Sequence, residues 1–153
     1  MREQLLKPSP QTTNEDKQPT ENFHTTKQKR DSAKVLVIED DEISGKINRI
    51  VLEQNNYQVT ECTSAEQAIG LKDIDFDLVI TDIGLPGMNG FEFASNFRTR
   101  ESVQERKNPA YIVGLSAHLG PRYQDLAEKS GMNKIITKPI AGTFKKKLLS
   151  NKN

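Results

Sequence analysis

The chain has 153 residues, the length of one ordinary domain, and its 22 Lys and Arg residues balance 21 Asp and Glu residues to a formal net charge of +1. That balance argues against a nucleic-acid-binding protein, and the single cysteine, Cys62, excludes an internal disulfide. No apolar run approaches the roughly 20 residues of a membrane span, and no apolar segment of a signal peptide is present, so we expect a cytoplasmic domain without membrane contact.

Residues 1–33 are rich in Gln, Thr, Asn, Lys, Glu and Pro and show no apolar periodicity. Pro8, Pro10 and Pro19 disfavour a long helix. We therefore expect a flexible linker over residues 1–33, with at most a short helix over residues 2–6, and a folded domain over residues 34–153.

The pattern changes at Lys34, where the apolar run VLVI over residues 35–38 stops at three acids and predicts a buried strand. Ile43, Ile47, Ile50 and Val51 then recur at helical spacing up to the two asparagines at 55–56. This spacing predicts an amphipathic helix whose apolar stripe covers one face of a sheet.

The alternation of strand and helix continues to the end of the chain. Strands are predicted over residues 58–61, 78–80, 111–115 and 134–137, and helices over 64–71, 91–100, 123–130 and 142–149. Ser64 and Gln67 have the spacing of a capping box at the second helix. Because parallel strands need crossover connections, the pattern predicts a doubly wound α/β fold with a five-stranded parallel sheet and five helices.

Polar side chains stand at the predicted carboxyl ends of the strands, where such sheets bind ligands. Glu39 and Asp40 follow the first strand, Asp82 the third, Ser116 the fourth and Lys138 the fifth. Clustered carboxylates repel one another unless a hard cation with oxygen ligands neutralises them, and Mg²⁺ suits this set. Asp82 stands alone at its strand end, so it is the best candidate for a nucleophile that attacks phosphorus.

Four motifs resemble those of response-regulator receiver domains, from Lys34 to the C-terminus. They are VLVIEDD at 35–41, TDIGLPGMNG at 81–90, GLSA at 114–117 and Lys138-Pro139. The resemblance implies a flavodoxin-like receiver topology. It also implies that Asp82 accepts phosphate from a phosphohistidine, and that Glu39, Asp40, Asp82 and the backbone carbonyl of Gly84 hold Mg²⁺.

By the same resemblance, Ser116 donates its hydroxyl to a phosphate oxygen after phosphorylation, and Lys138 pairs with the phosphate or with free Asp82. Pro139 is expected to follow a cis bond. One position departs from the family, which often has Tyr, Phe or His three residues before the lysine, where this chain has Ile135. The usual coupling of the hydroxyl to an aromatic rotamer is therefore not expected here.

Several other polar residues have ordinary structural explanations. Asp41 at a helix start is expected to cap that helix. His118 is expected in a loop, because two histidines far apart without cysteine partners do not suggest zinc. Cys62 is expected to be a half-buried packing residue, and the lysines at 145–147 to offset the dipole at a helix end.

The partners implied are a histidine kinase domain or a histidine phosphotransfer domain. A linker followed by a receiver resembles the C-terminal receiver of a hybrid sensor histidine kinase, and the alternative is a free-standing single-domain regulator.

An aspartate-nucleophile phosphatase would need a second acid two residues after Asp82, where Gly84 stands. A receiver that binds partners without phosphorylation would not need the full set of polar residues. Ile43, Ile47 and the loop over residues 86–88 are expected to contact the partner's helix.

Overall fold

The structure is a computed structural model that describes residues 32–140. Strands and helices alternate in the order β2 (Lys34–Ile38), α2 (Glu42–Gln54), β3 (Gln58–Cys62), α3 (Ala65–Ile69), β4 (Leu78–Asp82), α4 (Gly90–Val103), β5 (Tyr111–Ser116), α5 (Pro121–Ser130) and β6 (Lys134–Thr137). The predicted helices over residues 2–6 and 142–149, and nearly all of the predicted linker, lie outside the described residues.

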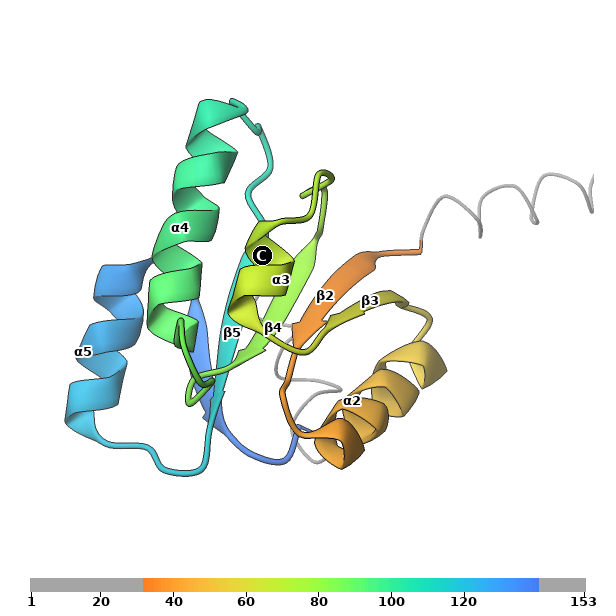
Figure 1. The fold of residues 1–153 in the computed structure, drawn as a ribbon, viewed down its shortest axis with the longest axis vertical. Helices are drawn as coiled ribbons and strands as arrows, with labels where there is room; N and C mark the ends of the chain where they lie inside the picture. Colours follow the sequence, from red (N-terminus) through yellow and green to blue (C-terminus); the bar gives the residue numbers. More distant parts are fainter. Residues whose placement is uncertain (1–31, 141–153) are drawn as a thin grey trace, which may run out of the picture. The chain divides into compact units, whose positions relative to one another are not determined.

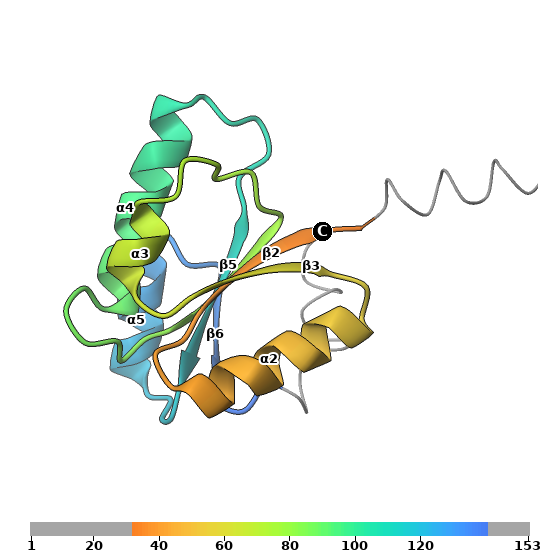
Figure 2. The ribbon, with the colours of Figure 1, turned by 45° about the vertical axis from the view of Figure 1, so that its right-hand side comes forward.

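The five strands form one sheet in the order β3-β2-β4-β5-β6, and every neighbouring pair is parallel. Helices α3, α4 and α5 cover one face of the sheet, and α2 lies against the other (Figures 1 and 2). The predicted doubly wound five-stranded α/β fold is confirmed. The carboxyl ends of the strands lie along the lower edge of the sheet in Figure 1, where α2, α3 and α5 begin.

The two faces of the sheet bury two separate apolar cores. The larger core lies under α3, α4 and α5 and includes Phe93 and Phe97, whose ring centroids are 5.5 Å apart. The smaller core, on the side of α2, includes Leu52 and Ile140. Because most residues of β2, β4 and β5 are buried, these strands have continuous apolar runs instead of alternating ones.

The predicted orientation of α2 is wrong. Ile43, Ile47 and Ile50 are 70%, 46% and 53% exposed, whereas the buried positions of the helix are Gly45, Asn48 and Leu52. A Cβ at position 45 would lie 3.9 Å from Glu39 Cγ, in ordinary van der Waals contact, so this face of the helix packs against the residue that follows β2. The isoleucine stripe therefore lies on the surface.

Three helix starts show how local sequence sets the element boundaries. Asp41 caps α2 as predicted, accepting a hydrogen bond of 2.8 Å from the Ser44 backbone, and this bond lowers the pKa of the Asp41 carboxyl. Helix α5 begins two residues earlier than predicted because Pro121 occupies its first turn. Helix α4 begins with a full capping box between Asn89 and Glu92, which was not predicted.

Helix α3 is shorter than predicted and ends at Ile69, just before Gly70. Ser64 caps it by accepting a hydrogen bond of 3.0 Å from Gln67 N. The other half of the predicted capping box differs, because Gln67 Oε1 accepts from the backbone N–H of Thr63, at 2.8 Å, instead of from that of Ser64.

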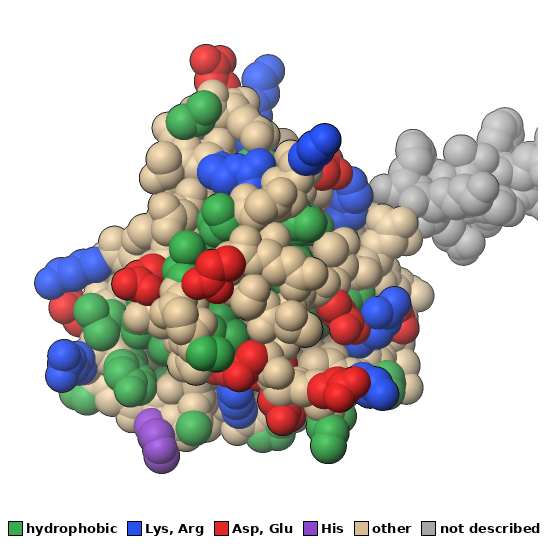
Figure 3. All heavy atoms as spheres, viewed as in Figure 1, with side chains coloured by type: hydrophobic (Ala, Val, Ile, Leu, Met, Phe, Trp, Pro, Cys, Tyr) green, Lys and Arg blue, Asp and Glu red, His purple; other side chains and the backbone are tan. Residues whose placement is uncertain are grey.

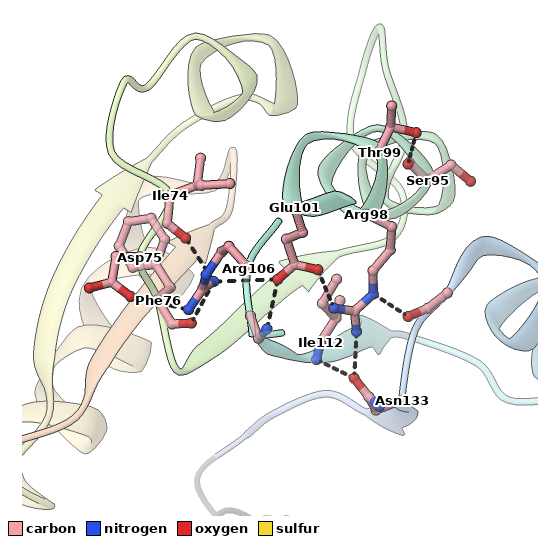
Figure 4. A network of polar contacts seen from close by, with 12 residues as sticks. Ile74, Asp75, Phe76, Ser95, Arg98, Thr99, Glu101, Arg106, Ile112 and Asn133 are labelled. Carbon is pink, nitrogen blue, oxygen red and sulfur yellow. Dashed lines mark hydrogen bonds and ion pairs between the residues drawn. The ribbon is translucent and has the colours of Figure 1, made fainter. Parts of the chain in front are cut away.

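A network of polar contacts holds α4 to three other segments at the end of the sheet opposite the strands' carboxyl termini (Figure 4). Glu101 is 4% exposed and accepts from Arg98 Nη1 at 2.6 Å, from Arg106 Nη1 at 3.4 Å and from the backbone of Ala110 at 2.7 Å. The arginines also donate to the backbone carbonyls of Gly131, Ile74 and Phe76. The buried carboxylate is therefore fully paired.

Candidate functional site

Two acids stand at the carboxyl ends of neighbouring central strands. Asp82 is the last residue of β4, and Glu39 follows β2, whose Ile38 pairs with Thr81. Asp40 is exposed beside them, while Glu39 and Asp82 are 4% and 8% exposed. One carboxylate oxygen from each of the three lies within 4.8 Å of the others, so the cluster could hold a metal ion.

Lys138, which follows β6, bridges the two buried acids. Its Nζ lies 3.2 Å from Asp82 Oδ2 and 3.4 Å from Glu39 Oε2. Partial burial acts to lower the pKa of this ammonium, but the negative charges of Glu39 and Asp82 outweigh it and raise the pKa of Lys138. The lysine is therefore held as a cation between the carboxylates. The Lys138–Pro139 bond is cis, as predicted.

The two oxygens of Glu39 have different surroundings. Oε1 accepts a hydrogen bond of 3.1 Å from the Asp41 backbone, whereas Oε2 is buried and accepts no hydrogen bond from the described residues. Burial, with the nearby charge of Asp82, raises the pKa of Glu39 even though Lys138 opposes the shift. A buried carboxylate oxygen that has an ion pair with Lys138 but accepts no hydrogen bond within residues 32–140, beside two more carboxylates, fits a hard divalent cation.

The loop after Asp82 returns close to the strand end. Gly84 N donates to Asp82 Oδ1 at 3.1 Å, and Gly90 N donates to Ile83 O at 2.9 Å. A Cβ added at Gly84 would meet nothing within 4 Å, so the side chain at this position is free to vary, as expected if only its carbonyl has a role. That role of Gly84 stays a prediction.

Ser116 ends β5, next to Asp82 at the end of β4, and its hydroxyl is already engaged. It donates to the backbone carbonyl of His118 and accepts from His118 N at 3.1 Å. The hydroxyl would have to leave this turn before it could bond a phosphoryl oxygen. His118 lies in the exposed loop after β5, as predicted.

Two predictions about packing have different outcomes. Ile135 is 5% exposed, pairs with Gly114 of β5 and belongs to the larger core. An aliphatic core residue thus occupies the position where the family often has a mobile aromatic side chain. Cys62 is 3% exposed, so it is buried more completely than predicted, and this burial raises the pKa of its thiol.

One contact near the site was not predicted from the sequence. The Glu66 carboxylate in α3 accepts a hydrogen bond of 2.7 Å from the backbone of Met88, in the loop after Asp82. No short sequence pattern indicates a contact across 22 residues. The capping box of α4, by contrast, follows the spacing N-x-x-E over residues 89–92 and could have been found.

The surface is mixed in character. Basic and acidic side chains are interspersed over the face shown in Figure 3, in agreement with the near-neutral net charge. Among residues 32–140, no helix is long and apolar enough to cross a membrane. The concentration of acids beside Asp82 is thus a local feature.

Known proteins resemble this chain in sequence and in fold. The model of the response regulator receiver domain family matches residues 35–148. Hybrid signal transduction histidine kinase C of Dictyostelium discoideum is 30% identical over 114 residues, which cover 72% of this chain but only 9% of that kinase. The chain therefore spans a small part of this relative.

Two crystal structures extend the comparison to the fold. The receiver domain of the Arabidopsis thaliana histidine kinase CKI1, complexed with Mg²⁺, has a TM-score of 0.63 at 22% identity and covers 71% of this chain and 84% of its own. The Saccharomyces cerevisiae complex of the phosphotransfer protein Ypd1 with the receiver domain of Ssk1 has a TM-score of 0.64 at 27% identity, covering 71% and 79%. By the family match and the five-stranded parallel fold, this chain belongs to the response regulator receiver domain family.

Proposed function

We propose that Asp82 accepts a phosphoryl group from a phosphohistidine in a Mg²⁺-dependent reaction. The observation that carries this proposal is the position of Lys138 Nζ beside the cluster of Glu39, Asp40 and Asp82. It lies 3.2 Å from Asp82 Oδ2 and 3.4 Å from Glu39 Oε2. A nucleophile, a cation and candidate metal ligands thus meet at one edge of the sheet.

The carboxylates of Glu39, Asp40 and Asp82, with the carbonyl of Gly84, would hold the Mg²⁺ ion. When bound, the ion neutralises the acidic cluster and withdraws charge from the phosphoryl oxygens. The Oε2 of Glu39, which is paired with Lys138 but accepts no hydrogen bond from the described residues, supports this assignment. The CKI1 receiver, which shares the fold, is a receiver crystallised with Mg²⁺.

In the transfer step, a carboxylate oxygen of Asp82 forms a bond to phosphorus as the bond from phosphorus to the imidazole nitrogen breaks. The electron pair of the breaking bond stays on the imidazole, and no proton leaves Asp82. Lys138 can then pair with the new phosphoryl charge instead of the free carboxylate. Ser116 can donate to a phosphoryl oxygen once its bond to His118 is broken.

The test is incubation with Mg²⁺ and acetyl phosphate, followed by intact-mass analysis. We expect one added phosphoryl group in the native chain, and none in Asp82→Ala or with excess EDTA. An unmodified native chain, or equal modification of Asp82→Ala, would contradict the proposal. Circular dichroism checks that Asp82→Ala is folded, and we expect its spectrum to match that of the native domain.

We also propose that the domain works in a cytoplasmic phosphorelay as part of a hybrid sensor histidine kinase. The similarity to a hybrid kinase supports this context, and the Ypd1–Ssk1 complex is an example of a receiver bound to a phosphotransfer protein. The exposed Ile43 and Ile47 provide apolar contacts for a partner's helix beside the acidic cluster. Loss of phosphate from phosphorylated Asp82 to a purified histidine phosphotransfer protein would support the relay. A phosphoaspartate that no such protein discharges would favour a free-standing regulator.

A further inference from the structure

The loop between β4 and α4, residues 83–89, connects the phosphoacceptor strand with a helix and contains Gly84. Backbone bonds secure its two ends, from Ile83 N to Leu115 O and from Gly90 N to Ile83 O, both at 2.9 Å. Its outer part is held from a different element, because Glu66 Oε2 in α3 accepts from Met88 N at 2.7 Å. This is a short, charge-assisted hydrogen bond.

Gly87 makes room for this contact. Its φ of +74° is unfavourable for residues with a side chain, and an added Cβ would lie 2.7 Å from Glu66 Oε2. The glycine therefore permits both the turn of the loop and the approach of the carboxylate.

Helix α3 does not need the Glu66 side chain for its own capping. Ser64 accepts from Gln67 N as the N-cap, and the Gln67 side chain accepts from Thr63 N, so the side-chain capping contacts at the start of the helix do not include Glu66. The Glu66 carboxylate is instead directed at the loop. Its contact joins two elements separated by 22 residues in sequence and adjoins the loop that carries Gly84.

We propose that Glu66 is a positioning residue for Mg²⁺ binding. It holds the outer part of the loop so that Gly84, tied to Asp82 Oδ1 through its backbone N–H, keeps the conformation that the ion requires. This inference rests on the proposed Mg²⁺ site. It assigns to α3 the role of holding the loop that carries Gly84. A residue that bonds a metal ligand directly commonly changes metal affinity by about 10- to 100-fold when removed; Glu66 acts through Met88, one step further from the ligand, so we expect a smaller change.

The test compares Glu66→Ala, Glu66→Gln and the control Glu53→Ala, whose carboxylate pairs with Arg49 on the surface of α2. Isothermal titration calorimetry with MgCl₂ measures the Kd, and amide hydrogen exchange measures the protection of Met88 N. We expect Glu66→Ala to raise the Kd several-fold and to expose the Met88 amide. Glu66→Gln, which keeps an oxygen acceptor, should recover most of the affinity, and Glu53→Ala should match the native domain.

Each outcome has a separate meaning. Native-like Mg²⁺ affinity in Glu66→Ala overturns the inference while leaving the proposed function intact. Equal loss in the Gln and Ala variants also overturns it, because the effect would then come from the charge of Glu66 and not from its hydrogen bond. Absence of Mg²⁺ binding in the native domain would instead refute the proposed function itself.

Discussion

Glu39 is a buried carboxylate whose ionised form is stabilised poorly by the protein alone. Burial raises its pKa above the ordinary value of 4.5, so folding disfavours its charge when no metal is bound. Glu39→Gln keeps the shape and removes the charge. We expect this variant to melt at a higher temperature than the native domain in EDTA at neutral pH.

Mg²⁺ should reverse that order. An ion at about 100 times its Kd stabilises the native domain by about 2.7 kcal/mol, and the variant, which lacks a ligand charge, should gain less. Thermal unfolding followed by circular dichroism, with EDTA and with MgCl₂, checks both halves. A variant that is less stable than the native domain in EDTA would show that the Lys138 contact outweighs the burial of Glu39.

The same raised pKa gives a pH dependence with a definite sign. A carboxyl whose folded pKa exceeds its unfolded value stabilises the fold when protonated, and this contribution is lost as the pH rises through the folded pKa. In EDTA, the advantage of Glu39→Gln should therefore shrink as the pH falls toward 4.5 and below. An advantage that is constant across this range would exclude Glu39 titration as its cause.

Two glycines near the end of β4, Gly84 in the loop after Asp82 and Gly90 at the start of α4, provide a matched pair of substitutions. A Cβ at Gly90 would lie 2.6 Å from Asp82 O and 2.8 Å from Ile83 Cα, so the backbone at the site would have to move. A Cβ at Gly84 would meet nothing within 4 Å. We expect Gly90→Ala to lose most of the phosphorylation by acetyl phosphate and Gly84→Ala to stay within about twofold of the native rate, since its carbonyl is unchanged. Equal rates would show that the loop adapts to the added methyl group.

At the scale of elements, Glu101 is the main polar anchor of α4. Removing it leaves Arg98, Arg106 and the amide of Ala110 without their shared acceptor in a largely buried position. Breaking such a pairing costs about 3 kcal/mol, whereas loss of an exposed pair costs about 0.5 kcal/mol. Urea unfolding of Glu101→Ala should show the larger loss, and Glu53→Ala, which breaks only a surface pair with Arg49, the smaller one. Comparable losses would mean that the arginines find other acceptors.

The elements also show which sequence signals were sufficient. Short apolar runs ending in polar residues located β2, β4, β5 and β6, because buried parallel strands have no competing polar face. Strand β3, with the mostly exposed sequence QVTEC, has no such run and was placed by the alternation of strands and helices. Glu39, Asp82 and Lys138 could be brought together from topology alone, since parallel strands end at one edge. The side of α2 that packs inward could not be predicted, because Gly45 and Asn48 carry no apolar signal and the isoleucines carry a strong one.

Long-range polar contacts were the other feature that could not be predicted from the sequence. Glu66 and Met88 are 22 residues apart, and Arg98 reaches Gly131, 33 residues away, so their pairing depends on the finished fold. Local rules of spacing apply within one or two helical turns and give no information at such separations. Side-chain identity could therefore suggest a charged or capping residue, but its partner required the structure.

At the scale of the whole molecule, the two ends of the sheet have different organisation. The carboxyl end concentrates three acids, of which Glu39 has a buried oxygen that accepts no hydrogen bond from the described residues, together with Lys138 and a Ser116 hydroxyl bonded only within its own turn. The opposite end has Glu101 and its arginines in a fully paired network (Figure 4). The end that holds Glu101 is thus stabilised by complete pairing, and no chemistry is proposed there. The carboxyl end of the strands keeps charges that a metal ion and a phosphoryl group would neutralise.

Substitution in the exposed isoleucine stripe of α2 tests whether a phosphohistidine protein docks beside Asp82. Ile43 is 70% exposed near the start of α2, and Val103 is 75% exposed at the end of α4, away from the acidic cluster. The minority of interface residues that anchor its centre each contribute more than about 1 kcal/mol, roughly a fivefold change in affinity. Ile43→Asp should therefore slow phosphotransfer from a phosphohistidine protein at least about fivefold while leaving the rate with acetyl phosphate nearly unchanged. Val103→Asp, with the same change in charge and polarity, should leave both rates unchanged. If Ile43→Asp slows both donors equally, its effect is on the chemistry of Asp82 and not on docking.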